Sequence, residues 1–495
     1  MTGLARTALL AASAVLAASC AVGPDFHAPA APTAKSYLRN EPEAGAAADV
    51  AHQAVAYGEP VANHWYRLFQ SEALSDLVKT ALAHNPTIEA AGASLRAARA
   101  EEAVVAGQLW PSLGASGGPS RTRYNGSYFY QPPQFEEGTA NRYSLTADLA
   151  YNLDIFGGTR RAIEASQADV AYQQAYAADA YATLVDAVVE TAFALSADRA
   201  RIAATEALIA SERKQLSLIQ AQEHAGAVAE DSVLSAQAQL EASERSLPGL
   251  RQAEAAAQNQ LAALLGTTPD AFDAPVPDLA AFTLPGQLPV SLPSDLVAQR
   301  PDIRMATDRL HKANAEIGVA EAARLPSLAL TAQYGAQSTT TANLFSGSAA
   351  IWSVAGDLAA PIFAGGSLAA EARAARARRD EAAASYRATV LNAFAEVASA
   401  LQAIGNDESA ASFAAQERET AGAARTLADR RLQAGAGNAL SLLIAESQYQ
   451  SAVLGEIDAT AQRFIDTARL MRALGGGWQD ATAQRAISES GDEHE

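Results

Sequence analysis

Alternation of apolar and polar residues marks three stretches of this chain as β-strands. Between 142 and 156, the apolar residues Leu145, Leu149 and Leu153 alternate with polar residues such as Asp148. Similar runs cover about 327–336 and 348–363, and a fourth strand is expected over about 112–126. A membrane-spanning strand needs about 9–11 residues, whereas a strand in a soluble domain is typically about 5–6 residues long. The pattern therefore predicts four strands long enough to cross a membrane, each with one apolar and one polar face.

Elsewhere the apolar spacing is that of long helices. Two proline-free helical patterns, 159–224 and 367–433, each extend for roughly 66 residues, or about 100 Å. Each is followed by a return helix of about 54 Å, over about 230–265 or 438–474. A helix this long needs neighbours to cover its apolar stripe. We therefore expect a cylinder of antiparallel helices.

Two shorter helices, each of about 23 residues, end before Pro111 and Pro326, because the residue before a proline is pushed toward extended geometry. A short helix and a return helix stacked end to end nearly match one long helix in length. The sequence therefore predicts that each return helix continues into a short one.

The same order of elements occurs twice. Asn85-Pro86 corresponds to Arg300-Pro301 at an offset of 300 − 85 = 215, and the turn at 156–158 corresponds to the turn at 363–366. Compositional similarity between Ala-rich helices would not reproduce paired prolines and glycines. The expected first repeat, second repeat and equatorial linker between them are 63–265, 293–475 and 266–292.

The N-terminus has the form of a secretory signal. Residues 1–19 carry one arginine and an apolar run, and small residues lead to Cys20, the only cysteine. This placement suggests a lipobox with an acylated Cys20, followed by an extended tether over 20–62. The alternative is a soluble exported chain with a free thiol. A disordered C-terminal tail is expected over 476–495.

Charge and hydropathy exclude several classes of protein. The formal net charge of −19 argues against nucleic-acid binding. After the signal no run of 18 or more apolar residues occurs, so we expect no transmembrane helix, and any membrane-spanning part must be a β-barrel. Four strands cannot close a barrel, because the smallest outer-membrane barrels have about eight. Two chains would supply eight strands and three would supply twelve.

Signals for an enzyme are weak. A G-x-S-x-G pattern at 114–118 is followed by Pro119 and a strand, whereas a nucleophile elbow needs a helix after it. The seven histidines lack paired metal-ligand spacing, and no phosphate loop is present. We expect no catalytic residues, no metal site and no cofactor.

Four separated motifs resemble those of NodT-type outer-membrane efflux lipoproteins, in the same order. They are the start at Cys20-Ala21-Val22-Gly23-Pro24-Asp25-Phe26, the segment 288–303, and the strand-to-helix turns at 154–158 and 361–366. The resemblance covers roughly 20–475. The family is similar to TolC, which implies a mainly α protein with a membrane β-barrel portion. Each chain would supply four strands and long antiparallel helices, and a homotrimer would form a twelve-stranded β-barrel and a twelve-helix α-barrel.

The resemblance also implies a function. The chain would be the passive outer-membrane exit duct of a tripartite efflux pump for small toxic compounds, with its helical part in the periplasm. Its partners would be a periplasmic adaptor, an inner-membrane transporter of the RND type and outer-membrane lipid. Alternatives are a duct for type I protein secretion and a non-conducting trimeric stalk.

Candidate functional residues fall into three groups. By resemblance, two helix-hairpin turns dock the adaptor and form the closed entrance, through Gly226, Glu230, Asp231, Ser232, Gly435, Gly437, Asn438 and Ser441. The glycines equally suit ordinary helix ends that need positive φ. Polar strand residues are candidates for lining the lumen, where they would disfavour anions, or for facing solvent: Asp148, Asn152, Asp154 and Asp357. The strand-to-helix turns contain Pro111, Gly157, Gly158, Pro326, Gly365 and Gly366.

Overall fold

The structure is a computed structural model that describes residues 21–30, 34, 36–38, 48–50, 53–124 and 138–476. The expected signal sequence, Cys20 and nearly all of the expected C-terminal tail lie outside the described residues. The chain divides into two compact units. The strand unit comprises 1–29, 96–172 and 306–386, and the helical unit comprises 30–95, 173–305 and 387–495. Each unit takes residues from both sequence repeats, so the repeats are not themselves compact units.

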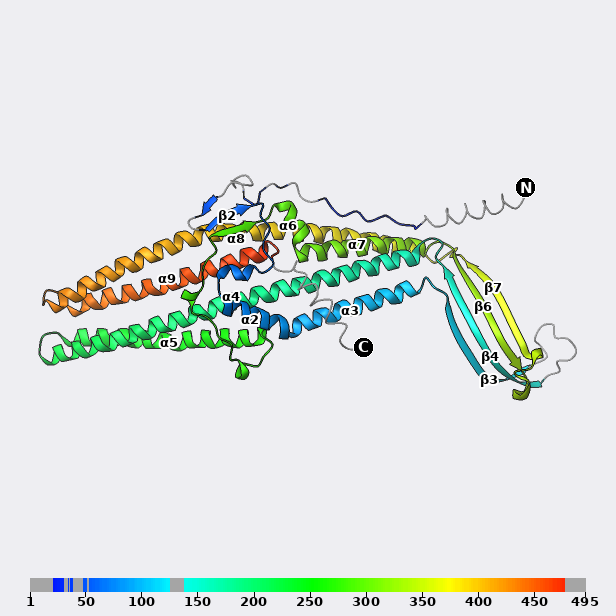
Figure 1. The fold of residues 1–495 in the computed structure, drawn as a ribbon, viewed down its shortest axis with the longest axis horizontal. Coiled ribbons are helices and arrows are strands. Elements are labelled where there is room, and N and C mark those ends of the chain that lie inside the picture. Colours follow the sequence, from blue (N-terminus) through cyan, green and yellow to red (C-terminus); the bar gives the residue numbers. More distant parts are fainter. Residues whose placement is uncertain are drawn as a thin grey trace. The chain divides into compact units, whose positions relative to one another are not determined.

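The strand unit contains a four-stranded antiparallel sheet (Figure 1). Its strands, in the order β3-β4-β6-β7, are Ser112–Tyr124, Gly138–Leu153, Ser327–Ser338 and Ala350–Ala359. With 10 to 16 residues each, they have the length expected for membrane-spanning strands. Among the described residues, no strand pairs with the outer edge of β3 or β7.

Two strands end earlier than the sequence predicts. The strand β4 stops at Leu153 rather than at 156, because the Asp154 carboxylate accepts hydrogen bonds from the backbone N–H groups of Thr159 and Arg160. This contact bends the chain into the next helix. The strand β7 stops at Ala359 rather than at 363, just ahead of Pro361, which has no N–H to donate to a ladder.

The helices follow the predicted boundaries closely. The long helices are α4 (Gly158–His224) and α8 (Ser367–Gln433), and the return helices are α5 (Glu230–Leu264) and α9 (Ala439–Ala473). The short helices before the strands are α3 (Pro86–Gly107) and α7 (Pro301–Ala322). In the strand unit, α7 and α8 approach closely through a cluster of small or branched residues: Ile317, Ala320, Ala372 and Ala375.

In the helical unit, the end of each return helix meets the start of a short helix, as the lengths predict. The Asn85 side-chain amide donates to the carbonyl of Leu264, the last residue of α5. In the second repeat, the Arg300 guanidinium donates to the carbonyl of Ala473, the last residue of α9. The residue before each proline therefore satisfies a free carbonyl at a helix end.

An aromatic cluster fills the core of the helical unit. Phe193 of α4 lies 4.8 Å from Phe69, 4.8 Å from Phe282 and 5.2 Å from Phe464, measured between ring centroids. Phe69 ends the 3-10 helix η1 (Trp65–Phe69), which is followed by α2 (Glu72–His84). The cluster thus joins segments from both repeats around one buried ring.

A second, small sheet lies in the helical unit and was not predicted. Its strands β1 (Ala48–Val50), β2 (Gln53–Tyr57) and β5 (Gln287–Val290) have the order β1-β2-β5, with β2 parallel to β5. The expectation of a tether over 20–62 is therefore wrong for its second half. The expected linker also contains β5 and the 3-10 helices η2 (Pro269–Ala271) and η3 (Leu279–Ala281), and α6 (Pro293–Gln299) follows it.

Two helices are long and apolar enough to cross a membrane by length and composition alone, which differs from the sequence expectation. Each of α4 and α8 contains an apolar window of 18 residues. In α4, 78% of that window is buried inside the chain, as in the core helix of a soluble domain, against 28% in α8. The windows meet the criterion because small alanines raise the mean hydropathy even where polar residues interrupt the run.

Candidate conduction face, charged pocket and helical tips

The register of the four-stranded sheet separates an apolar face from a polar face. The apolar face carries large exposed side chains: Leu113, Leu145, Leu330, Tyr334, Trp352, Val354 and Leu358. Trp352 is 76% exposed and Leu358 is 70% exposed. Contact of such large apolar side chains with water is unfavourable, whereas their contact with lipid is favourable. The opposite face carries the polar residues of the same strands.

On the polar face, Asp148 is the centre of a hydrogen-bond network. Its carboxylate accepts hydrogen bonds from Gln333 Nε2 at 2.7 Å, Ser116 Oγ at 3.0 Å and Thr146 Oγ1 at 3.1 Å. These residues come from β3, β4 and β6, and Gln333 is directly paired with Asp148 in the register. Ser116 of the G-x-S-x-G pattern is therefore a strand residue in a polar cluster.

Asn152 and Asp357 lie in one row across the same polar face. Ala329 of β6 pairs with Asn152 on one side and with Asp357 on the other. Both polar side chains are exposed, and the small alanine between them leaves the row open. These residues could face either a water-filled lumen or bulk solvent.

Asp154 lies elsewhere than expected. It follows the end of β4, and its carboxylate caps the first turn of α4 through Thr159 N at 2.9 Å and Arg160 N at 3.0 Å. An ion pair with Arg160 Nε at 3.1 Å adds to this contact. The residue is a helix cap in the turn rather than a residue of the polar strand face.

The strand-to-helix turns place glycine where backbone geometry demands it. Gly157, Gly365 and Gly366 have φ of +76°, +60° and +83°, whereas Gly158 is already the first residue of α4. Pro111 and Pro326 lie directly before β3 and β6, each four residues after the last residue of a short helix. At Gly157 an added Cβ would lie 2.6 Å from Ala21 Cβ, so this turn is also closed by the segment that contains Ala21.

The two helical tips have the same backbone construction. Gly226 and Gly435 have φ of +71° and +70°. The next residue in each case, Ala227 or Ala436, donates its N–H to a carbonyl five residues earlier. This is the Schellman ending of a helix, and it explains both glycines structurally. Gly437 is different, because an added Cβ would lie 3.1 Å from Arg431 Cβ.

The polar residues of the tips divide into caps and free groups. The Asn438 side chain accepts a hydrogen bond from Ser441 N at 2.8 Å and caps α9. At the other tip, Glu230 and Asp231 lie exposed in the first turn of α5, where their charges favour the helix dipole. Ser232 Oγ donates to Asp231 Oδ1 at 3.3 Å. The tips also pack on each other through Ile219, Ala236 and Ala439.

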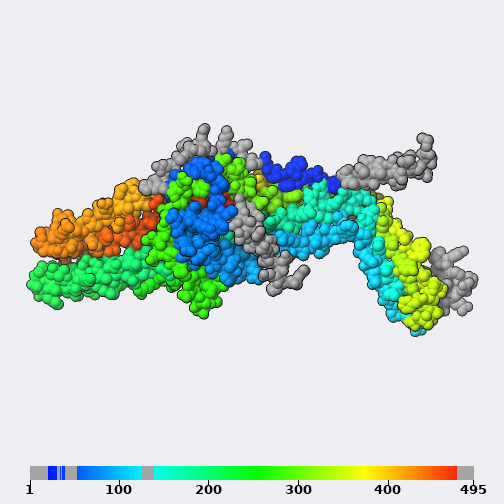
Figure 2. Space-filling model, viewed as in Figure 1, coloured from blue at the N-terminus to red at the C-terminus, as the bar shows by residue number. Residues whose placement is uncertain are grey.

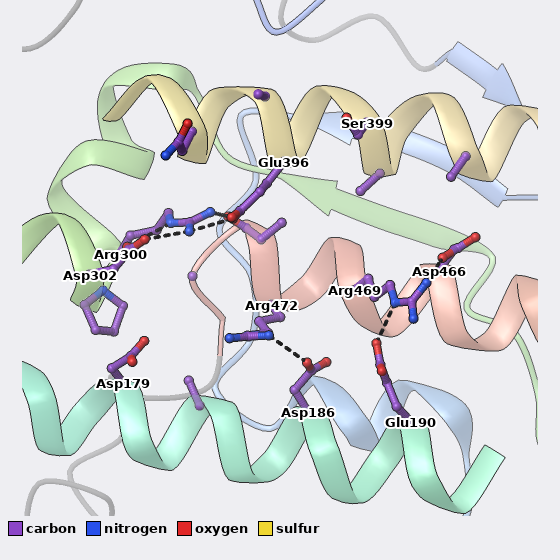
Figure 3. Close-up of a pocket in the computed structure, with 18 residues that line it drawn as sticks. Asp179, Asp186, Glu190, Arg300, Asp302, Glu396, Ser399, Asp466, Arg469 and Arg472 are labelled. Carbon is purple, nitrogen blue, oxygen red and sulfur yellow. Dashed lines mark hydrogen bonds and ion pairs between the residues drawn. The ribbon is translucent and has the colours of Figure 1, made fainter. Parts of the chain in front are cut away.

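A charged pocket of about 960 Å³ lies in the helical unit among α4, α8 and the end of α9 (Figure 3). Arg300 projects into it from the start of α7 and donates to Asp302 and Glu396, each at 2.7 Å. On the opposite side, Arg472 and Arg469 of α9 pair with Asp186 and Glu190 of α4, at 3.3 and 2.8 Å. The pocket is thus crossed by ion pairs that join α4, α8 and α9.

Burial raises the pKa of two carboxyl groups in this region. The pKa of Asp186 rises to about 6 because burial and the neighbouring Glu190 disfavour its charge, against the attraction of Arg472. The pKa of Asp407 rises to about 7 because it is desolvated and shares a hydrogen bond with Asp466. The α8–α9 contact therefore holds a proton near neutral pH.

Ion pairs that hold the helices together were missed in the sequence. Arg201 of α4 donates to Asp458 of α9 at 2.6 Å and so links the two helical hairpins. Arg161 at the start of α4 pairs with Asp25 of the N-terminal segment and with Glu164 of its own helix, and its side chain is only 7% exposed. Neither the alternation of apolar and polar residues nor the positions of the glycines indicates such contacts. The sequence does contain one indication of such pairs. Arg199, Glu206 and Arg213 follow each other along α4 at intervals of seven residues, and each forms an ion pair with α5.

Comparison with known proteins identifies the family. The family model described as outer membrane efflux protein matches residues 77–267 and 292–476. The chain belongs to the outer membrane efflux protein family. It is 31% identical over 477 residues to the antibiotic efflux pump outer membrane protein ArpC of Pseudomonas putida, covering 96% of both chains. It is 33% identical to outer membrane protein OprJ of Pseudomonas aeruginosa, covering 93% of this chain and 94% of that protein.

The solved structure of the outer-membrane channel OprN is similar throughout. The TM-score is 0.84 at 29% identity, with 93% of this chain and 100% of that chain covered. The chain is therefore a TolC-like outer-membrane efflux channel whose helical part lies in the periplasm. This placement assigns the exposed apolar face of the sheet to the membrane and the long helices to water.

Proposed function

We propose that several copies of this chain, most economically three, close their sheets into one barrel that serves as the exit duct of a tripartite efflux pump. The observation that supports this is the four-stranded sheet, whose β3 and β7 edges have no partner among the described residues. An unpaired edge inside a membrane is costly, because lipid offers no hydrogen bonds. A second copy supplies the missing partner: β7 of one chain would pair with β3 of the next.

Cargo passes along the polar face of the barrel in this proposal. Asp148, Asn152 and Asp357 line the lumen, and the carboxylates repel anions at close range. Asp154 is left out, because its carboxylate is occupied by the start of α4. The cargo consists of small toxic compounds, in keeping with relatives named as antibiotic and toluene efflux pump proteins.

The helical tips form the closed entrance and the docking surface for a periplasmic adaptor, which joins the duct to an inner-membrane RND transporter. Glu230 and Asp231 are the exposed charges there that an adaptor could contact. The backbone at Gly226 and Gly435 shapes the turns. The acylated Cys20 would hold the chain at the membrane, one residue before the docked segment that begins at Ala21.

Deletion of the gene with complementation tests this proposal. The deletion strain is expected to become susceptible to small toxic compounds, and the wild-type gene is expected to restore resistance. Unchanged susceptibility together with loss of a secreted protein would show a secretion duct instead. Purified assemblies that never conduct would identify a stalk.

A further inference from the structure

A pocket of about 850 Å³ lies in the strand unit, close to the start of β6, and is distinct from the polar strand face. Its walls combine apolar and basic side chains from three segments: Val22, Ile317, Leu325, Arg324, Arg376 and Arg379. The three arginines are 43 to 57% exposed, so their guanidinium groups are accessible. Several arginines therefore lie close together here, although the protein as a whole is acidic, with a net charge of −19.

Glu321 holds two of these arginines in place. Its two carboxylate oxygens contact Arg324 of the loop after α7 and Arg376 of α8, one nitrogen from each guanidinium. A guanidinium has about five N–H donors, so each arginine keeps donors for a further ligand. Arg379 pairs with Asp380, which is 71% exposed and weakly held.

The first turns of α8 add more positive charge. Residues 373–379 contain four arginines and no acid. Arg373 and Arg378 are exposed, and no ion pair is recorded for either among the described residues. Five arginines (324, 373, 376, 378 and 379) and four acidic residues (321, 371, 380 and 381) lie in or next to these segments, which leaves a small excess of positive charge.

The pocket lies at the depth of the periplasmic headgroups. Arg324 precedes Ser327, the first residue of β6, by three residues, or at most about 10 Å of chain. The headgroup region is about 5–8 Å thick on each side of the hydrocarbon, and arginine side chains extend toward it. Ile362 and Phe363, which follow β7, are 93% and 91% exposed, as expected for residues at a membrane interface.

The wall formed by the N-terminus is fixed by many contacts (Figure 2, dark blue). Val22 donates its N–H to the Phe156 carbonyl at 3.0 Å and accepts from Arg161 Nε at 3.1 Å. Asn314 donates to the Pro24 carbonyl at 2.8 Å. Close packing of Gly23 on α7 leaves no room for a larger residue at position 23. Residues 22–24 are thus extended, as expected, and are held against α4 and α7 by these contacts.

We propose that this pocket binds the phosphate headgroup of an anionic phospholipid of the periplasmic leaflet, through Arg324, Arg376 and Arg379. Guanidinium groups match phosphate oxygens by paired, charge-assisted hydrogen bonds. The apolar residues Val22, Ile317 and Leu325 would contact the glycerol end of the lipid. The site rests on the membrane location of the chain and not on its pump partners.

Native mass spectrometry of the purified full-length assembly tests the proposal. The probes are phosphatidylglycerol and phosphatidylethanolamine with the same acyl chains. We expect wild-type protein to prefer phosphatidylglycerol. Each arginine near a membrane surface contributes about 1 kcal/mol, or about fivefold, so R324Q/R376Q/R379Q should weaken phosphatidylglycerol binding at least ~10-fold. Binding of phosphatidylethanolamine, whose phosphate is balanced by its own ammonium group, should weaken less.

Matched variants separate charge from folding. R213Q/R251Q removes two exposed, ion-paired arginines of α4 and α5 and should bind like wild type. R376Q alone removes one of the three guanidinium groups and should weaken phosphatidylglycerol binding about fivefold, so it serves if the triple variant does not assemble. Equal binding of both lipids by wild type, or wild-type affinity in the triple variant, would overturn the proposal. Complete displacement of the lipid by inorganic phosphate would identify a free-phosphate site and overturn it too.

Discussion

At the scale of single residues, one carboxylate shows how a local contact decides where an element ends. Asp154 continues the alternating pattern of β4, and yet its side chain turns back to bind the first N–H groups of α4. Alternation alone assigns it to the strand. The capping contact depends on a glycine turn that brings the start of α4 close to Asp154. The alternation of apolar and polar residues does not indicate this turn.

Replacing Asp154 with Ala should destabilise the protein by about 1 kcal/mol, because the N–H groups of Thr159 and Arg160 lose their acceptor. D154N keeps one acceptor oxygen and should cost less. Thermal unfolding followed by the helical circular dichroism signal measures both. D357A, which removes an exposed carboxylate of the polar face, should change stability by less than about 0.5 kcal/mol. A loss in D154A no greater than that in D357A would contradict the cap.

The carboxyl pair between α8 and α9 predicts a pH dependence. Burial and Asp466 raise the pKa of Asp407 to about 7, against the attraction of Arg463, while Glu408 pairs with Arg463. The folded protein thus keeps a proton that the unfolded chain releases near its ordinary value of 3.8. Stability should therefore fall as pH rises from about 4 to about 7, and stay lower above that.

D407N removes this titration. Relative to wild type, the variant should be more stable above about pH 7, and the difference should vanish below about pH 3, where Asp407 is protonated in both states. Unfolding temperatures measured across this range compare the two proteins. A difference between them that does not vary with pH would contradict the account of Asp407.

At the scale of elements, the helices could be placed from sequence almost to the residue, because glycine and proline mark their ends. Gly226, Gly435 and Gly266 all sit at positive φ just after helices. The small sheet of β1, β2 and β5 could not be found. Its strands have three to five residues, and β2 pairs with β5 across more than 200 positions of sequence. The polar face was recognised at Asp148, but its partner Gln333 requires the strand register.

The tip geometry makes a prediction about glycine. G226A or G435A places a side chain at φ near +70° and should destabilise its turn by about 1 kcal/mol. Hydrogen exchange of the tip peptides should then increase. G455A is the control, because Gly455 lies inside α9 with open space around an added Cβ. Faster exchange in G455A than in G435A would contradict the assignment.

The ion pair between the two hairpins predicts an effect on opening. D458N removes the link from Arg201 to α9 and leaves Arg201 paired with Asp198. Openings of the reconstituted channel should become about two- to fivefold more frequent, as an exposed ion pair of up to about 1 kcal/mol allows. E244Q breaks a pair within the α4–α5 hairpin and should leave the opening frequency unchanged. Equal effects of the two variants would rule out the hairpin link.

At the scale of the whole molecule, the requirement for more than one chain was already present in the sequence. The sequence predicts four strands, fewer than the roughly eight that the smallest membrane barrels need. The described sheet indeed has four strands, and its edges at β3 and β7 are unpaired among the described residues. Its exposed apolar face needs lipid, and its polar face needs water. The number of copies could not be derived in the same way, because eight and twelve strands both close.

The central claim is that copies of this sheet enclose a water-filled pore, and single-channel recording in planar bilayers tests it most directly. The measurement uses the purified D458N assembly, in which loss of the ion pair between the two helical hairpins favours opening of the channel. This assembly should give discrete conductance steps with a preference for cations. That preference should decrease in D148N/D357N. Absence of any conductance from correctly inserted D458N assemblies would contradict the account.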